Sequence, residues 1–257
     1  MFPQSEFVKR VQGSERAGRK TVIPPNALRL DKGEPNFRTP EHIQEAATRA
    51  MRDNFTHYGN AYGDMELREA ICMALNRDYG VQREPKNVLI TTGGIEAIHV
   101  LTSTYLNPGD DVLIPNPEYS AYADSVNLFG GNPVFAPLNP DFSLNIDSMK
   151  ANITEKTKLI FVSNPSNPSS RLMSEKDIRD LAQLAYDHNC FLVVDEVYSK
   201  LLYEGAKHFS ITEIDEIKDR AILLNSFSKT YAMTGWRVGY IVADEPVIKQ
   251  LVDIHKA

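Results

Sequence analysis

The sequence of 257 residues contains only two cysteines, one tryptophan and no excess of positive charge. Cys72 and Cys190 belong to no cluster with metal-ligand spacing, so we expect a reducing compartment and no structural metal. The formal net charge of −6 and the lack of a basic tract argue against a nucleic acid partner. None of the six histidines stands in a metal-spaced or triad-like group.

Long apolar runs are missing as well. No segment approaches the uninterrupted apolar length that a membrane span needs. Met1 to Lys20 carries scattered charges and no apolar core, so we expect no signal peptide and a cytoplasmic location. Apolar residues make up 42% and charged residues 24%, as in soluble globular proteins, and the length suits one large domain or two small ones.

The most informative stretch runs from Ser226 to Tyr240. Short apolar runs at 221–224 and 238–243 flank it and are typical of buried strands. Lys229 is predicted to lie on the loop between these strands, where it can be held against a pocket. Partial burial or nearby cations lower the pKa of such an amine and make it a nucleophile toward a carbonyl carbon.

The same stretch also offers groups that bind an anion. Arg237 can bind a phosphate through its guanidinium fork, and Ser226 and Ser228 add hydroxyl donors. The loop therefore suits a ligand with both an aldehyde and a phosphate, which describes pyridoxal 5'-phosphate (PLP). The alternative is a surface lysine on an ordinary turn. However, Ser-x-Ser-Lys followed by Gly-Trp-Arg-x-Gly-Tyr closely resembles the lysine signature of the PLP-dependent class I/II aminotransferases, whose first member is aspartate aminotransferase.

Strand-like and helix-like segments alternate from residue 87 onward, which predicts an α/β fold with a mostly parallel sheet sandwiched by helices. The expected strands are 87–92, 111–115, 132–138, 158–163, 191–194, 221–224 and 238–243. The main expected helices are 40–53, 65–79, 95–106 and 174–189. The resemblance covers nearly the whole chain from about Leu30 and implies the large PLP-binding domain at 41–257, after an arm and the start of a small domain at 1–40.

A strand, two glycines and a helix follow one another around Gly93 and Gly94. Backbone N–H groups at such a helix start attract an anion. The segment resembles the family's phosphate-binding cup, in which Ile95 stands where a hydroxyl is expected but keeps its N–H group. In the connector between the expected helices 40–53 and 65–79, the resemblance implies a tyrosine that reaches the phosphate of the other subunit of a homodimer. Tyr58 is the candidate, with Tyr62 as second choice.

Asp195 lies just past the end of a buried strand, where open α/β sheets place ligand chemistry. The resemblance implies that it faces the pyridine nitrogen of PLP and keeps it protonated. By the same resemblance, Tyr198 and Asn167 donate to the 3'-oxygen, and Tyr119 stacks on the ring. Gly33 is implied to lie beside the substrate carboxylate.

Two positions depart from the family pattern. Ser170 replaces the glycine that usually follows the second Asn-Pro pair, which costs stability if that residue needs a positive φ. Asn36 stands where aspartate is usual, and no chemistry is assigned to it.

The resemblance implies an aminotransferase in which Lys229 holds PLP as a Schiff base and then carries the α-proton between substrate and cofactor. The amino group moves from an amino acid to a 2-oxo acid. Family members continue into a C-terminal small domain that carries the arginine for the substrate α-carboxylate, so we expect a shortened form with an unassigned substrate. The alternatives are a PLP-dependent lyase of the same fold, a non-catalytic PLP-binding module, and a nucleotide-binding α/β domain. The nucleotide-binding alternative is disfavoured, because the sequence contains neither a Gly-x-Gly-x-x-Gly run nor a Walker-type motif.

Overall fold

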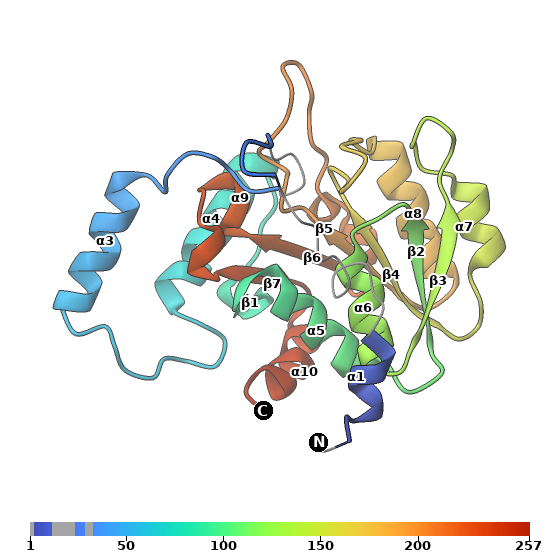
Figure 1. Cartoon of the computed structure of the whole chain (residues 1–257), viewed down its shortest axis with the longest axis horizontal. Helices are drawn as coiled ribbons and strands as arrows, with labels where there is room; N and C mark the ends of the chain where they lie inside the picture. The colour runs from blue at the N-terminus through green and yellow to red at the C-terminus, as the bar shows by residue number, and fades with distance from the viewer. Residues whose placement is uncertain (1–2, 12–23, 29–32) are drawn as a thin grey trace.

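The computed structural model describes residues 3–11, 24–28 and 33–257 (Figure 1). Its seven-stranded sheet has the order β1-β7-β6-β5-β4-β2-β3. The strands are β1 (Val88–Thr91), β2 (Asp111–Asn116), β3 (Asn132–Pro137), β4 (Thr157–Ser163), β5 (Phe191–Asp195), β6 (Ala221–Ser226) and β7 (Gly239–Val242). The pairs among β2 to β6 are parallel, whereas β7 is antiparallel to both of its neighbours. The predicted α/β class with a mostly parallel sheet is confirmed.

Helices cover both faces of this sheet (Figure 1). The α-helices of the described residues are α1 (Glu6–Val11), α3 (Glu41–Arg52), α4 (Met65–Tyr79), α5 (Gly93–Tyr105), α6 (Ser120–Leu128), α7 (Ile146–Asn152), α8 (Glu175–Asp187), α9 (Phe227–Thr230) and α10 (Glu245–His255). The turns η1 (Pro85–Asn87), η2 (Ile211–Glu213), η3 (Asp215–Ile217) and η4 (Thr234–Trp236) are 3₁₀ helices. Side chains of β4 alternate between two cores: Leu159 and Phe161 pack with α5, α6 and α10, and Ile160 and Val162 with α4, α7 and α8.

Both cysteines lie in the core on the α4 and α8 side, and both are free thiols. Burial raises the pKa of the Cys190 thiol to about 11, so it stays protonated at neutral pH. In this environment Cys190 behaves as a small buried hydrophobe.

Local signals place the helix ends. A capping box starts α8, because the Ser174 hydroxyl accepts from the Asp177 N–H (3.2 Å) while Asp177 accepts from the Ser174 N–H (2.9 Å). The predicted start at Pro40 is likewise followed by α3 at Glu41. Helix α4 ends at Gly80, whose φ of 71° is a left-handed cap.

The segment before α3 lies against the chain around η4. The Thr39 hydroxyl donates to the Ala232 carbonyl (2.6 Å), and the Thr234 hydroxyl donates to Glu34 (2.7 Å). Helix α3 itself buries no residue and stands to one side of the sheet in Figure 1. The domain boundary at residue 40 therefore stays a prediction.

Two details differ from the expected elements. Lys229 was expected on a loop, but it lies in the short helix α9, because the Ser226 hydroxyl caps that helix by accepting from the Ser228 N–H (3.1 Å). Helix α5 begins at Gly93 rather than at residue 95, since a glycine can take the φ of 77° at that turn.

Candidate active site

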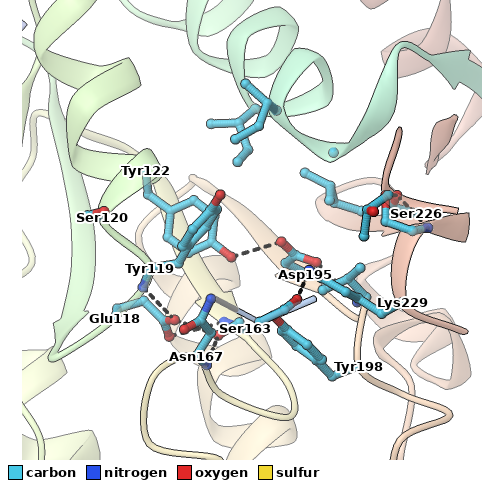
Figure 2. Close-up of a pocket in the computed structure, with 18 of the residues that line it drawn as sticks. Glu118, Tyr119, Ser120, Tyr122, Ser163, Asn167, Asp195, Tyr198, Ser226 and Lys229 are labelled. Atoms are coloured by element: carbon cyan, nitrogen blue, oxygen red, sulfur yellow. Dashed lines mark hydrogen bonds between the residues drawn. The ribbon is translucent and has the colours of Figure 1, made fainter. Parts of the chain in front are cut away.

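A cavity of about 560 Å³ opens at the carboxyl ends of the parallel strands. Sequence-predicted residues from distant parts of the chain line it together. They are Gly33, Gly94, Ile95, Tyr119, Asn167, Asp195, Tyr198, Ser226, Ser228, Lys229 and Arg237. Figure 2 shows how several of their side chains point toward one another around this space. The location agrees with the rule that open α/β sheets bind ligands at this edge.

Lys229 projects from α9 into the cavity. Its Nζ donates to the Gly33 carbonyl and lies 5.9 Å from the centre of the Tyr198 ring. Partial burial lowers the pKa of this amine below its usual value, and Arg237 acts in the same direction, while Glu34 and Asp195 oppose them. The lowered pKa increases the fraction of neutral, nucleophilic amine at a given pH.

One side of the cavity is built from glycine backbone and a guanidinium group. Gly93 opens α5 with a φ of 77°, and a Cβ there would meet Arg237 Nη2 at 2.5 Å. Gly239 lies on the other side of Gly93, where a Cβ would meet the Gly93 carbonyl carbon at 2.7 Å. Only residues without side chains let the N-terminus of α5 approach Arg237 and β7 so closely. The resulting corner combines a helix N-terminus with a cation, which suits a phosphate group.

The two serines at the end of β6 face the same corner. Ser226 and Ser228 are both buried, and their hydroxyls lie 2.8 Å apart in a hydrogen bond. The Ser226 hydroxyl also lies 3.0 Å from the Val238 carbonyl. Arg237 is anchored by donation from Nη1 to the Thr234 carbonyl (2.7 Å) and has a φ of 57°.

The opposite side of the cavity is built around Asp195 at the end of β5. Its carboxylate accepts from the Tyr122 hydroxyl (3.0 Å) and the Val197 N–H (3.1 Å), as Figure 2 shows for the tyrosine. Burial raises the pKa of Asp195 to about 6, opposed by these two donors and by Lys229. The carboxyl is thus mostly ionised at neutral pH, in position to face a cation. Burial and the nearby Asp195 charge raise the pKa of Tyr198, which keeps its hydroxyl protonated as a donor.

Sequence reasoning missed two side chains of this half. Glu118 lines the cavity directly before Tyr119, and its carboxylate contacts Ser163 at the end of β4. Tyr122 is fully buried, stacks on Phe161 at 4.9 Å and donates to Asp195. In the sequence, only position could have indicated Glu118 and Tyr122, because both follow a buried strand and lie within one helical turn of Tyr119, the predicted stacking residue.

A third missed group lies behind the site, where Glu196 is fully buried. Its Oε1 accepts from the Ser210 hydroxyl (3.0 Å) and the Ile211 N–H (2.8 Å), which closes the base of the loop that carries Tyr198. Burial raises the pKa of Glu196 to about 8 and lowers that of His208 to about 4. Both groups are therefore mainly uncharged at pH 7, and their 3.8 Å approach is not an ion pair.

Two predicted features lie away from the cavity. Tyr58 is fully exposed on the connector between α3 and α4, and it does not line the cavity of this chain. Tyr62 packs beneath the Arg68 guanidinium at 5.6 Å instead. Ser170 has a φ of 59°, so the replacement of the usual glycine does place a serine in the left-handed region.

The comparisons with known proteins agree with this geometry. The model of the family "Aminotransferase class I and II" matches residues 25–257. The chain belongs to this family. Its members depend on PLP.

Individual members of the family are also similar to the chain. An aspartate aminotransferase of Pyrococcus abyssi is 40% identical over 92% of the chain, and an aromatic-amino-acid aminotransferase of Thermococcus litoralis is 38% identical over 88%. The crystal structure of an aromatic aminotransferase from Pyrococcus horikoshii is 36% identical and superposes on 97% of the chain with a TM-score of 0.88, covering 65% of that structure. The chain spans about 60% of the length of the two curated relatives.

The residues around the cavity fit the family's cofactor. The corner at Gly93 that a Cβ would fill offers N–H groups, hydroxyls and a guanidinium for a phosphate. An amine for an aldehyde and a carboxylate for a ring nitrogen lie across the same space, at Lys229 and Asp195. Among the described residues, no group of three or more His, Cys, Asp or Glu side chains is arranged to hold a metal ion. In the described part of the chain, no helix has both the length and the apolar character for crossing a bilayer.

Proposed function

We propose that this chain provides the cofactor site of a PLP-dependent aminotransferase, which moves an amino group between an amino acid and a 2-oxo acid. One observation carries the proposal: the Lys229 amine, the Asp195 carboxylate and the Arg237 guanidinium line one cavity of about 560 Å³. Family membership supports it. The proposal includes a large domain at residues 41–257.

When bound, PLP supplies an aldehyde for covalent attachment and a ring that accepts electrons. Lys229 holds the cofactor through Nζ and, with its lowered pKa, takes and returns a proton at that atom. Asp195 holds a proton on the ring nitrogen through its buried carboxylate. Tyr119 supplies the stacking face, and Tyr198 and Asn167 donate to the 3'-oxygen.

The phosphate is held by Gly93, Gly94 and Ile95 through backbone N–H groups at the start of α5. Ser226, Ser228 and Arg237 complete this anion site. Gly33 lies beside the substrate carboxylate, and its carbonyl contact with Lys229 supports that place. The proposal further includes a cytoplasmic homodimer, in which Tyr58 reaches the phosphate site of the other subunit. The full exposure of Tyr58 supports that part.

The first test is the absorbance spectrum of the purified chain after saturation with PLP and dialysis. Borohydride reduction and peptide mapping then identify the modified residue, and we expect Lys229. The spectrum is then repeated after addition of a panel of amino donors, to follow the conversion to pyridoxamine phosphate. The panel includes aspartate and aromatic amino acids, the substrates named for the relatives. Release of ammonia or CO₂ instead of a 2-oxo acid would identify the lyase alternative.

The second test is Lys229→Ala. Loss of the proton carrier is expected to reduce the half-reaction by at least about 100-fold, because positioned acid–base groups contribute 10²–10⁴ in rate. Lys176→Ala is the matched control, since Lys176 is an exposed lysine on α8 paired with Asp180. Near-normal conversion in Lys229→Ala would contradict the assignment. A wild-type chain that retains cofactor but converts no donor would instead be a PLP-binding module.

A further inference from the structure

Glu118 connects two residues that belong to different loops of the cavity. Its Oε1 accepts from the Tyr119 N–H (2.9 Å), and its Oε2 accepts from the Ser163 N–H (3.1 Å). The Ser163 hydroxyl donates to the same carboxylate. Figure 2 shows Glu118, Tyr119 and Ser163 on the side of the cavity opposite Lys229.

The contact continues beyond Ser163. The Ser163 hydroxyl accepts from the Asn167 N–H (2.9 Å), which belongs to the loop after β4. A hydroxyl has one proton, and here it is directed to Glu118 while a lone pair receives Asn167. The hydrogen bonds therefore run in one direction, from the Asn167 amide through Ser163 to Glu118. Hydrogen bonds to a charged acceptor are shorter and stronger than neutral ones.

We propose that Glu118 is a positioning residue that fixes Tyr119 and Asn167 as one unit against the cofactor ring. The proposal rests on the proposed function, in which Tyr119 stacks on the ring and Asn167 donates to the 3'-oxygen. Without the carboxylate, the Ser163 hydroxyl loses its acceptor, and the backbone N–H of Asn167 loses the hydroxyl orientation that receives it. Both ring contacts then change together, although neither side chain has been altered.

Burial supports an organised carboxyl at this place. Removal from water raises the pKa of Glu118 to about 7, and hydrogen bonds from Ser163 and Tyr119 work against that rise. Asp195 on β5 is the charged neighbour that raises it further. The buried Glu118 carboxyl accepts three hydrogen bonds, which fits a role in holding structure rather than in facing solvent.

The test measures PLP affinity and the apparent pKa of the cofactor absorbance band for four variants of the whole chain. Glu118→Ala and Ser163→Ala are each expected to weaken PLP binding by about 10-fold, as for loss of hydrogen bonds to a charged group. The double variant is expected to match the single variants, because the residues act in series. Glu118→Gln is expected to lie between, since Oε1 still accepts from Tyr119 while the Ser163 N–H loses its partner.

The apparent pKa of the cofactor absorbance band distinguishes a positioning role of Glu118 from a general loss of stability. A displaced Asn167 donor leaves the 3'-oxygen less stabilised as an anion, so the apparent pKa of the band is expected to rise in Glu118→Ala and Ser163→Ala. Exposed Glu204→Ala removes a carboxylate outside the network and is expected to leave affinity and band unchanged. Unchanged values in Glu118→Ala, or single effects that multiply in the double variant, would overturn the proposal.

Amide hydrogen exchange in the chain without PLP separates this proposal from the proposed function. The Asn167 amide is expected to exchange at least about 10-fold faster in Glu118→Ala and in Ser163→Ala than in the wild type. If the wild type retains no PLP, the proposed function fails, and exchange alone decides on Glu118. Exchange that stays at the wild-type rate in both variants would show that Glu118 does not position Asn167.

Discussion

The two halves of the cavity are built by different means. The phosphate half depends on the backbone around Gly93, where a helix N-terminus, a neighbouring strand and Arg237 approach without side chains between them. The ring half depends on side chains that are held by other side chains, as Tyr122 holds Asp195 and Glu118 holds Ser163. Both halves join segments that lie far apart along the chain, but the first does so through backbone that lacks side chains and the second through hydrogen bonds between side chains.

This difference predicts different failures. Changes in the phosphate half are expected to weaken cofactor binding, because they displace the anion donors. Changes in the ring half are expected to alter rate, spectrum or pH dependence, with losses of PLP affinity of about 10-fold or less. Asp195→Asn and Gly93→Ala test this contrast, and Glu196→Gln and Ser170→Gly test the stability of the elements around the ring half; each has a matched control.

The largest effect is expected in the ring half for Asp195→Asn. A neutral amide cannot balance a positive charge on the ring nitrogen, so the transamination rate is expected to fall at least about 100-fold, as for loss of a preorganised electrostatic group. PLP affinity is expected to fall less than about 10-fold, since the phosphate donors are intact. Steady-state kinetics and a PLP titration measure the two effects. Asp180→Asn on α8, outside the cavity, is the control, and equal losses in rate and affinity would contradict the contrast.

Gly93→Ala tests the phosphate half. The new methyl would meet Arg237 Nη2 at 2.5 Å and Cζ at 2.9 Å, at a φ of 77° that strains any L side chain. PLP affinity is expected to fall by about 30-fold, equivalent to about 2 kcal/mol, with little change in the rate of the saturated enzyme. The control is the adjacent Gly94→Ala, whose Cβ meets Leu224 at an ordinary 3.4 Å. Equal affinities in the two variants would show that close approach at Gly93 is not required.

Much of the site could be predicted because its motifs are compact. Asp195 ends a buried strand, Lys229, Asn167 and the Gly93 turn lie within a few residues after one, and the carboxyl ends of such parallel strands meet at one edge of a sheet. The antiparallel direction of β7 was not predicted, because residues 227–238 between β6 and β7 are about as many as the shortest crossover to a parallel strand needs.

The supporting network could not be predicted from spacing. Glu118 and Ser163 are distant along the chain, and only the parallel pairing of β2 with β4 brings them into contact. The neutral state of Glu196 likewise depends on burial by several elements at once. Such groups carry no motif, because their chemistry comes from the environment rather than from the residue type.

Glu196→Gln tests, through the pH dependence of stability, whether the buried acid behind the ring half is protonated. Because folding raises the pKa of Glu196 from 4.5 to about 8, its contribution is fully present below pH 4.5 and is lost as the pH rises through 8. The glutamine variant cannot ionise, so its free energy of unfolding relative to wild type is expected to rise by about 3 kcal/mol between pH 5 and pH 8. Urea unfolding at several pH values measures this difference. Exposed Glu175→Gln is the control, and parallel curves for wild type and Glu196→Gln would refute the assignment.

The smallest effect is expected for Ser170→Gly in the loop after β4. Relief of the positive φ of 59° outweighs the added freedom of glycine in the unfolded chain, which gives a net gain of about 0.5 kcal/mol in stability. Thermal unfolding measures the gain. Ser169→Gly is the control, because Ser169 accepts from the Arg171 N–H (3.3 Å) and is expected to lose stability. A loss in Ser170→Gly would show that the serine is favoured there for another reason.

The position of β7 between β1 and β6 also bears on how the chain is made. Val88 of β1 pairs with Val242 of β7, and β1 has no other partner in the sheet. On the ribosome, β2 to β5 emerge and can pair well before β7 is translated, whereas β1 waits for it with an unpaired edge. The ring half can therefore form before β7 is translated, while the phosphate corner closes only after it. An early strand that depends on a late one makes the cofactor pocket a marker of completed translation through residue 242.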